Sequence, residues 1–149
     1  ILANLKSTYL ILAGPDEEGI SSKMKKYKLN IIFIGLTQIP QDLLNMSNII
    51  CLPSYREGFG NVVIEAAAVG LPSIVSNIYG LSDSIVKNKT GLTHKPGDVK
   101  GLSNQMEYAY LNQKLMIDFG KAAQKRARIE FDSKILVNHW KHFYSQNLV

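Results

Sequence analysis

Residues 52–72 read LPSYREGFGNVVIEAAAVGLP, a segment that predicts a strand end, a glycine-containing loop, a helix and a sharp stop, in that order. Asn61 is the candidate helix cap, and Gly70, which is followed by Leu-Pro, should end the helix. Within residues 62–69 only Glu65 is polar, and an almost wholly apolar helix is typically buried. Because a buried carboxylate costs several kcal/mol unless it is satisfied, we expect Glu65 to have a partner.

Short apolar runs alternate with helical patterns on both sides of this segment. The predicted strands are about four to six residues long and nearly continuous in apolar character, as is typical of parallel strands covered on both faces. They comprise residues 8–13, 30–34, 49–52, 73–76 and 91–94. Helices are predicted at residues 17–27, 40–46, 61–69 and 81–87, and towards the C-terminus at residues 99–110, 113–130 and 133–145. This alternation predicts an α/β fold: a Rossmann-like, doubly wound parallel sheet with extra C-terminal helices, in one domain of residues 1–149.

Turn and polar residues follow four of the predicted strands, after Ala13, Ile34, Leu52 and Ser76. Ligands of open α/β sheets bind beyond the carboxyl ends of the strands. We therefore expect these four loops to converge in space.

The loop after Leu52 carries two glycines and a glutamate. Gly58 and Gly60 allow the backbone to approach a ligand closely, where the next helix presents unpaired N–H groups and a diphosphate is the usual occupant. Glu57 would repel that phosphate and is expected to accept hydrogen bonds from neutral hydroxyls instead. A phosphate flanked by hydroxylated groups describes a nucleotide-sugar. The residues alone leave a second interpretation open, in which the glycine pair is an ordinary turn and Glu65 gains only about 0.3–1 kcal/mol from the helix dipole.

The composition is that of an ordinary globular protein, with 46% hydrophobic and 19% charged residues and a net charge of +5. This excess of positive charge could favour anionic ligands or an acidic membrane surface. The basic cluster at residues 23–28 is interpreted as the solvated face of an amphipathic helix, and it gives little support to nucleic-acid binding. The single cysteine, Cys51, is expected to be buried and structural. No apolar run approaches the roughly 20 residues that span a bilayer.

The central segment resembles the signature of the glycosyl transferases group 1 family, whose members are retaining enzymes with the GT-B fold. The hallmark of that family is a pair of glutamates separated by seven residues after a Pro-Ser strand end, here Glu57 and Glu65. The Gly-Phe-Gly after Glu57 and the continuation Glu-Ala-Ala-Ala-x-Gly-x-Pro match as well. Flanking segments agree over nearly the whole chain: residues 10–15, 32–35, 76–86, 90–92 and 96–98.

The resemblance implies a role for each motif residue. Glu57 would contact the hydroxyls of the donor sugar as the catalytic residue, and Glu65 would contact the ribose of the nucleotide. The full donor-binding set would be Gly58, Phe59, Gly60, Asn61 and Glu65, with Gly14, and with Gly35 and Leu36 near the base. Two departures weaken the match: Asp83 stands where the family usually carries Glu, and Ser82 where it usually carries proline.

By the same resemblance, the chain is the C-terminal, donor-binding half of a GT-B enzyme. It is expected to be a fragment that lacks its own first strand, the N-terminal acceptor domain, and the Arg and Lys that bind the diphosphate. Alone it should bind nucleotide weakly and catalyse little. The histidines His94, His139 and His142 lie outside any motif and are interpreted as structural or surface residues.

The intact protein is expected to transfer a sugar, with retention, from a UDP- or GDP-linked donor to a saccharide or lipid-linked acceptor, in cell-surface polysaccharide or glycolipid synthesis. A cytoplasmic location is expected, with peripheral association at the inner face of the membrane compatible with the charge. No Asp-x-Asp motif or His/Cys cluster points to a metal, and the donor is a substrate and not a cofactor. Two alternatives stay open: a non-catalytic nucleotide-binding module, and a GT-B nucleotide-sugar epimerase.

Overall fold

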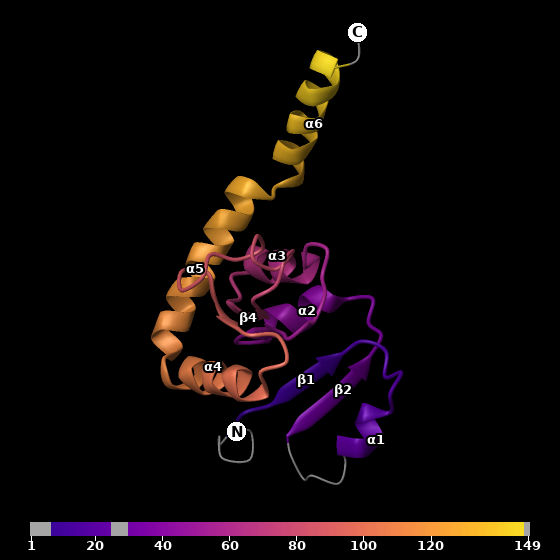
Figure 1. The fold of residues 1–149 in the computed structure, drawn as a ribbon, viewed down its shortest axis with the longest axis vertical. Helices are drawn as coiled ribbons and strands as arrows, with labels where there is room; N and C mark the ends of the chain where they lie inside the picture. Colours follow the sequence, from indigo (N-terminus) through magenta and orange to yellow (C-terminus); the bar gives the residue numbers. More distant parts are fainter. Residues whose placement is uncertain (1–6, 25–29, 148–149) are drawn as a thin grey trace. The chain divides into compact units, whose positions relative to one another are not determined.

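A computed structural model describes residues 7–24 and 30–147 of the chain. The chain divides into two compact units, residues 1–40 and residues 41–149, which are described separately (Figure 1). Parallel strands alternate with helices through both units, and this confirms the predicted α/β class. The single domain of residues 1–149 stays a prediction.

The first unit is built on two parallel strands, β1 (Leu10–Ala13) and β2 (Ile31–Gly35). Their register shifts between Leu12 and Ala13, so that Ala13 lies opposite Gly35. Both strands lie within about two residues of the ranges predicted from their apolar runs.

Helix α1 (Ile20–Met24) begins later than the predicted start at residue 17. The cause is Asp16, whose carboxylate accepts hydrogen bonds from the N–H groups of Ile20 at 2.6 Å and Ser21 at 3.0 Å. The pKa of Asp16 is held below its usual value, first by the Ser21 hydroxyl and then by these two backbone N–H groups. The rest of this predicted helix and most of the basic cluster lie in residues 25–29, outside the described residues.

The second unit contains a three-stranded parallel sheet, ordered β3 (Ile50–Leu52), β4 (Ser73–Ser76) and β5 (Gly91–His94). The ranges of β4 and β5 are those predicted. All four residues of the central strand β4 are buried, because side chains on both of its faces are covered.

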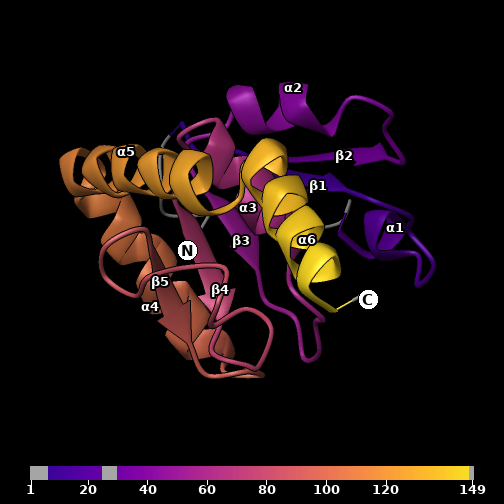
Figure 2. The ribbon, with the colours of Figure 1, turned by 90° about the horizontal axis from the view of Figure 1, so that it is seen from above.

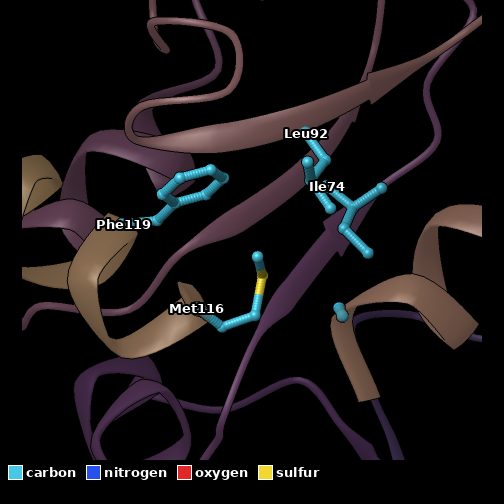
Figure 3. Close-up of a cluster of buried hydrophobic side chains, with 5 residues drawn as sticks. Ile74, Leu92, Met116 and Phe119 are labelled. Atoms are coloured by element: carbon cyan, nitrogen blue, oxygen red, sulfur yellow. The ribbon is translucent and has the colours of Figure 1, made fainter. Parts of the chain in front are cut away.

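One face of this sheet is covered by α4 (Val99–Leu111) and the first half of α5 (Gln113–Glu130), which lie along the same side of the strands (Figure 2). Ile74 and Leu92 from neighbouring strands meet Met116 and Phe119 of α5 in a buried cluster (Figure 3). Cys51 of β3 is partly buried and packs against the same cluster, so its predicted packing role is confirmed but its full burial is not.

The opposite face is covered by α3 (Asn61–Ala68), because side chains alternate along a strand and Val75 points away from Ile74. Val75 packs with Val63 of α3 and with Leu81. Helix α2 (Pro40–Asn45) contributes Leu44 to an adjoining cluster with Ala66. The second half of α5 reaches α3, where Ala67, Ala123 and Ala127 are buried together.

The last helix, α6 (Ser133–Asn147), has no buried residue. Its aromatic side chains contact one another, with the rings of Trp140 and Tyr144 stacked at 5.8 Å between centroids. His139 and His142 are exposed on the same helix, as expected of surface residues. None of the helices in the described ranges is long and apolar enough to cross a membrane.

The helix predicted at residues 81–87 is wrong, because the structure has turns there and a single bridge between Lys87 and Gly91. Its apolar residues are spaced as in a helix, but nearby hydroxyl groups hold the backbone otherwise. The hydroxyl of Ser84 donates to the carbonyl of Leu81 at 2.7 Å, and the Val86 N–H donates to the Thr90 hydroxyl at 2.8 Å. Side-chain bonds of this kind compete with helical ones.

Candidate functional site

The carboxylate of Glu57 is oriented by a residue of its own loop. Residues 53–60 connect β3 to α3, and we call them the glycine loop. In this loop the hydroxyl of Ser54 donates to Oε1 of Glu57 at 2.9 Å. Glu57 is half-buried, so part of the carboxylate remains open to a ligand. Glu57, the predicted catalytic residue, thus lies beyond the carboxyl end of a parallel strand, and its carboxylate is oriented by Ser54 to accept further hydrogen bonds.

Helix α3 begins at a buried glycine. Gly60 has the left-handed φ of +66°, and a Cβ there would overlap the side chain of Leu81, so this position requires glycine. The prediction that Asn61 caps the helix is wrong, because Gly60 occupies the cap position and Asn61 is the first helical residue. In the part of the chain that the structure describes, no side chain caps α3. The Val63 N–H donates to the Gly60 carbonyl at 2.8 Å, which leaves the N–H groups before Val63 available to an anion.

The C-terminus of α3 is as predicted. Gly70 has a φ of +81°, and its N–H donates to the carbonyl of Ala67 at 2.9 Å. The N–H of Leu71 donates to the carbonyl of Ala66, also at 2.9 Å. These two bonds form a Schellman motif, which fixes the length of the helix behind the glycine loop.

The loop after β4 meets the glycine loop at Gly80. A Cβ on Gly80 would overlap the carbonyl oxygens of Glu57 and Gly58, which shows how closely the two backbones approach. The predicted convergence of the loops after Leu52 and Ser76 is therefore confirmed. Sequence patterns singled out Gly80 only as a turn residue, because nothing local to it indicates a contact with a distant loop.

Glu65 does not lie in the core. It is exposed, and so are Asn61 and Ala68, while Val63 and Ala66 are buried. The prediction of a buried Glu65 that needs a partner is wrong. The helical period places Asn61, Glu65 and Ala68 on one side of α3, and that side faces solvent although the helix as a whole is mostly apolar.

Phe59 packs within the second unit. Its ring lies 5.6 Å from that of Phe131, between centroids, and its exposed fraction is 37%. Phe131 follows directly after α5, and no local sequence pattern connects it with the glycine loop. Gly58 has open space around its Cα, which fits the predicted close approach of a ligand.

The remaining predicted donor residues belong to the first unit. The N–H of Gly14 donates to the carbonyl of Gly35 at 2.8 Å, and both glycines have positive φ values, +129° and +71°. Leu36 is 82% exposed. The structure thus brings Gly14 and Gly35 together at the ends of β1 and β2. Their convergence with the glycine loop stays a prediction.

Two polar side chains are buried at the ends of β4 and β5, where Ser76 lies opposite His94. In the described residues, Oγ of Ser76 and Nε2 of His94 have no hydrogen-bond partner, while Nδ1 of His94 lies 2.9 Å from the Lys95 carbonyl. His94 is therefore buried, and the structural role expected of it stays a prediction. No group of three or more His, Cys, Asp or Glu residues in the described ranges could hold a metal ion. The absence of a metal requirement stays a prediction.

Comparison with known proteins gives a consistent result. The family model for glycosyl transferases group 1 matches residues 1–126. A capsular polysaccharide biosynthesis glycosyltransferase of Staphylococcus aureus is 32% identical over 116 residues, covering 78% of this chain and 30% of the relative. N-acetyl-alpha-D-glucosaminyl L-malate synthase of Bacillus anthracis is 29% identical over 137 residues, covering 91% of this chain and 36% of the relative.

Solved structures agree in fold. Sucrose-phosphate synthase from Thermosynechococcus elongatus superposes with a TM-score of 0.85 at 26% identity, covering 93% of this chain and 38% of that one. The Anabaena protein HepE, solved in complex with UDP, gives a TM-score of 0.88 at 19% identity, covering 95% of this chain and 42% of that one. This chain therefore spans between 30% and 42% of the length of these proteins.

Proposed function

The chain belongs to the glycosyl transferases group 1 family, and we propose that it forms the donor-binding half of a retaining glycosyltransferase. One observation carries the proposal. The uncapped N-terminus of α3, the held carboxylate of Glu57 and the close approach of Gly80 meet at the carboxyl ends of β3 and β4. A nucleotide-diphosphate-sugar matches these groups in charge and in hydrogen-bonding chemistry.

The diphosphate would bind at the start of α3. The helix dipole and the N–H groups before Val63 favour negative charge there, and these fixed donors would stabilise the charge that develops on the leaving nucleoside diphosphate. Open space at Gly58 leaves room for the phosphates to approach the backbone. No metal and no cofactor is required in this scheme.

The donor sugar would be held by Glu57. Because Ser54 donates to one carboxylate oxygen, the other oxygen is free to accept hydrogen bonds from sugar hydroxyls. The ribose would be held by Glu65, whose exposure on α3 leaves it accessible to a bound nucleotide. We assign Gly14, Gly35 and Leu36 to the nucleotide side of the donor.

The intact protein would use this site in polysaccharide or glycolipid synthesis, with a saccharide or lipid-linked acceptor. The capsular polysaccharide enzyme of S. aureus supports this context by its name. UDP or GDP would carry the sugar, and the reaction would take place in the cytoplasm or at the inner face of the membrane.

Isothermal titration of the 149-residue chain with UDP and GDP tests the donor site. We expect weak binding of one nucleotide, and a loss of about tenfold to hundredfold in affinity for Glu65→Gln, which removes a charged hydrogen bond. Glu107→Gln is the matched control, because Glu107 is an exposed glutamate on α4, away from the glycine loop. Equal binding by Glu65→Gln and the unchanged chain would overturn the ribose assignment, and no binding of either nucleotide would overturn the donor site.

Activity is tested on the intact protein with a labelled nucleotide-sugar. We expect transfer to an acceptor with retained anomeric configuration, and a strong loss in Glu57→Gln. Turnover of the donor without any acceptor would instead identify an epimerase. Binding without turnover would identify a non-catalytic module.

A further inference from the structure

Phe59 carries the only side chain in the Gly-Phe-Gly sequence of the glycine loop, and it contacts a residue far away in the sequence. Phe59 lies against Phe131, the residue that ends α5, with the ring planes tilted by 56°. Tilted rings at this separation attract one another. A loop with two glycines has little rigidity of its own, so this contact helps to restrain its position.

Phe131 is itself held by Arg126. The guanidinium carbon of Arg126 lies 5.0 Å from the centroid of the Phe131 ring, which is the geometry of a cation–π contact. The same side chain is only 18% exposed and pairs with Glu130, with Nε 2.7 Å from Oε2. Its Nη2 donates to the backbone carbonyl of Asp83 at 2.8 Å.

These contacts connect the glycine loop with the segment that follows β4. Asp83 belongs to the segment after β4, whose Gly80 touches the glycine loop directly. Arg126 thus binds one loop through Asp83, and it binds the other through Phe131 and Phe59. Gly80 contacts the backbone of the glycine loop at Glu57 and Gly58, and Phe131 contacts its Phe59 side chain.

We propose that Arg126 and Phe131 are positioning residues that hold the glycine loop in its donor-binding arrangement and so set the affinity for the nucleotide. This inference rests on the proposed function. The N–H groups at the start of α3 and the carboxylate of Glu57 can act on one ligand only while the loop between them keeps its place. A looser loop would spend part of its time in arrangements that do not bind, and the apparent affinity would fall in proportion.

Hydrogen exchange and titration with UDP test the proposal in the 149-residue chain. In Phe131→Ala we expect faster amide exchange in residues 54–63 and an affinity for UDP up to about tenfold weaker, the limit set by one aromatic pair. Phe131→Tyr keeps the ring and should keep both properties. Arg126→Lys loses the planar guanidinium group. Its amide exchange in residues 54–63 and its affinity for UDP should lie between those of Phe131→Ala and Phe131→Tyr. Phe143→Ala is the matched control, because Phe143 is a 53% exposed phenylalanine on α6 whose ring contacts are to Trp140 and Tyr144.

The contact itself is tested by a double variant. If Phe59 and Phe131 act on one another, the fall in the unfolding midpoint of Phe59→Ala with Phe131→Ala will be smaller than the sum of the two single effects.

Unchanged exchange in residues 54–63 of Phe131→Ala, or unchanged UDP affinity in a chain that binds UDP, would overturn the positioning role. If the unchanged chain binds neither UDP nor GDP, the proposed function fails together with the effect on affinity. Exchange in residues 54–63 then decides by itself whether Phe131 orders the loop.

Discussion

Replacing Gly80 by alanine should destabilise the second unit and displace the loop that carries Glu57. Gly80 has a φ of +88°, a conformation that residues with a Cβ rarely adopt. The new Cβ would also overlap the carbonyl oxygen of Glu57 and come within 2.6 Å of the carbonyl oxygen of Gly58. Both are backbone atoms, so no change of rotamer can relieve the overlap.

The magnitude follows from these two effects. A left-handed backbone costs an L-residue about 1–2 kcal/mol, and forcing atoms into filled space costs typically about 1–3 kcal/mol more. Alanine also lowers the conformational entropy of the unfolded chain, which offsets about 0.4–1 kcal/mol of this loss in stability. The net loss of roughly 1–4 kcal/mol is a large part of the 5–15 kcal/mol typical of a folded domain.

Urea denaturation followed by circular dichroism measures this loss. At an unchanged m-value, the midpoint of Gly80→Ala should fall, because the free energy of unfolding is the product of midpoint and m-value. Gly58→Ala is the matched control in the adjoining loop, since a Cβ on Gly58 would meet no atom within 4 Å. Equal midpoints for Gly80→Ala and the unchanged chain, or equal losses for the two variants, would show that the backbone at Gly80 accommodates a Cβ.

Three further predictions concern other parts of the second unit. Gly120→Ala should destabilise it by about 1–3 kcal/mol, because the Cβ would overlap the carbonyl oxygen of Gly70 between α5 and α3; denaturation midpoints measure this, and a neutral effect would contradict the close packing. Asp98→Ala should cost about 1 kcal/mol, because the Asp98 carboxylate caps α4 by accepting from the Gly101 N–H at 2.8 Å; Asp98→Ser should recover most of it. The thiol of Cys51 should resist iodoacetamide at neutral pH until the chain unfolds, because burial raises its pKa to about 11; rapid labelling of the folded chain would show that the thiol is accessible.

Local patterns were enough to predict many of the elements. The ranges of β4, β5 and α5 were predicted without error, because each is an apolar or amphipathic run bounded by residues that break it. The end of α3 at Gly70 was predictable for the same reason, since only glycine adopts its left-handed φ of +81° without strain. The position of Glu57 beyond β3 also followed from the pattern alone.

The errors arose where composition was taken to report burial or helicity. The apolar neighbours of Glu65 predict a position in the core, yet Glu65 lies on the side of α3 that faces solvent. Residues 81–87 were predicted as a helix because their apolar residues are spaced as in one, but the hydroxyls of Ser84 and Thr90 bind the backbone instead. Burial depends on which neighbours cover a residue, and a single segment does not contain that information.

Most residues of the candidate site, from Glu57 to Glu65, thus lie in one short segment, because a strand, a glycine loop and a helix start are local structures specified by neighbouring residues. What holds that segment in place is assembled from other parts of the chain. Gly80 contacts the backbone of the glycine loop, and Phe131 contacts Phe59. The sequence around Gly80 or Phe131 does not indicate either contact. Such contacts arise only when the packing of α3 and α5 around the sheet brings remote residues within van der Waals distance.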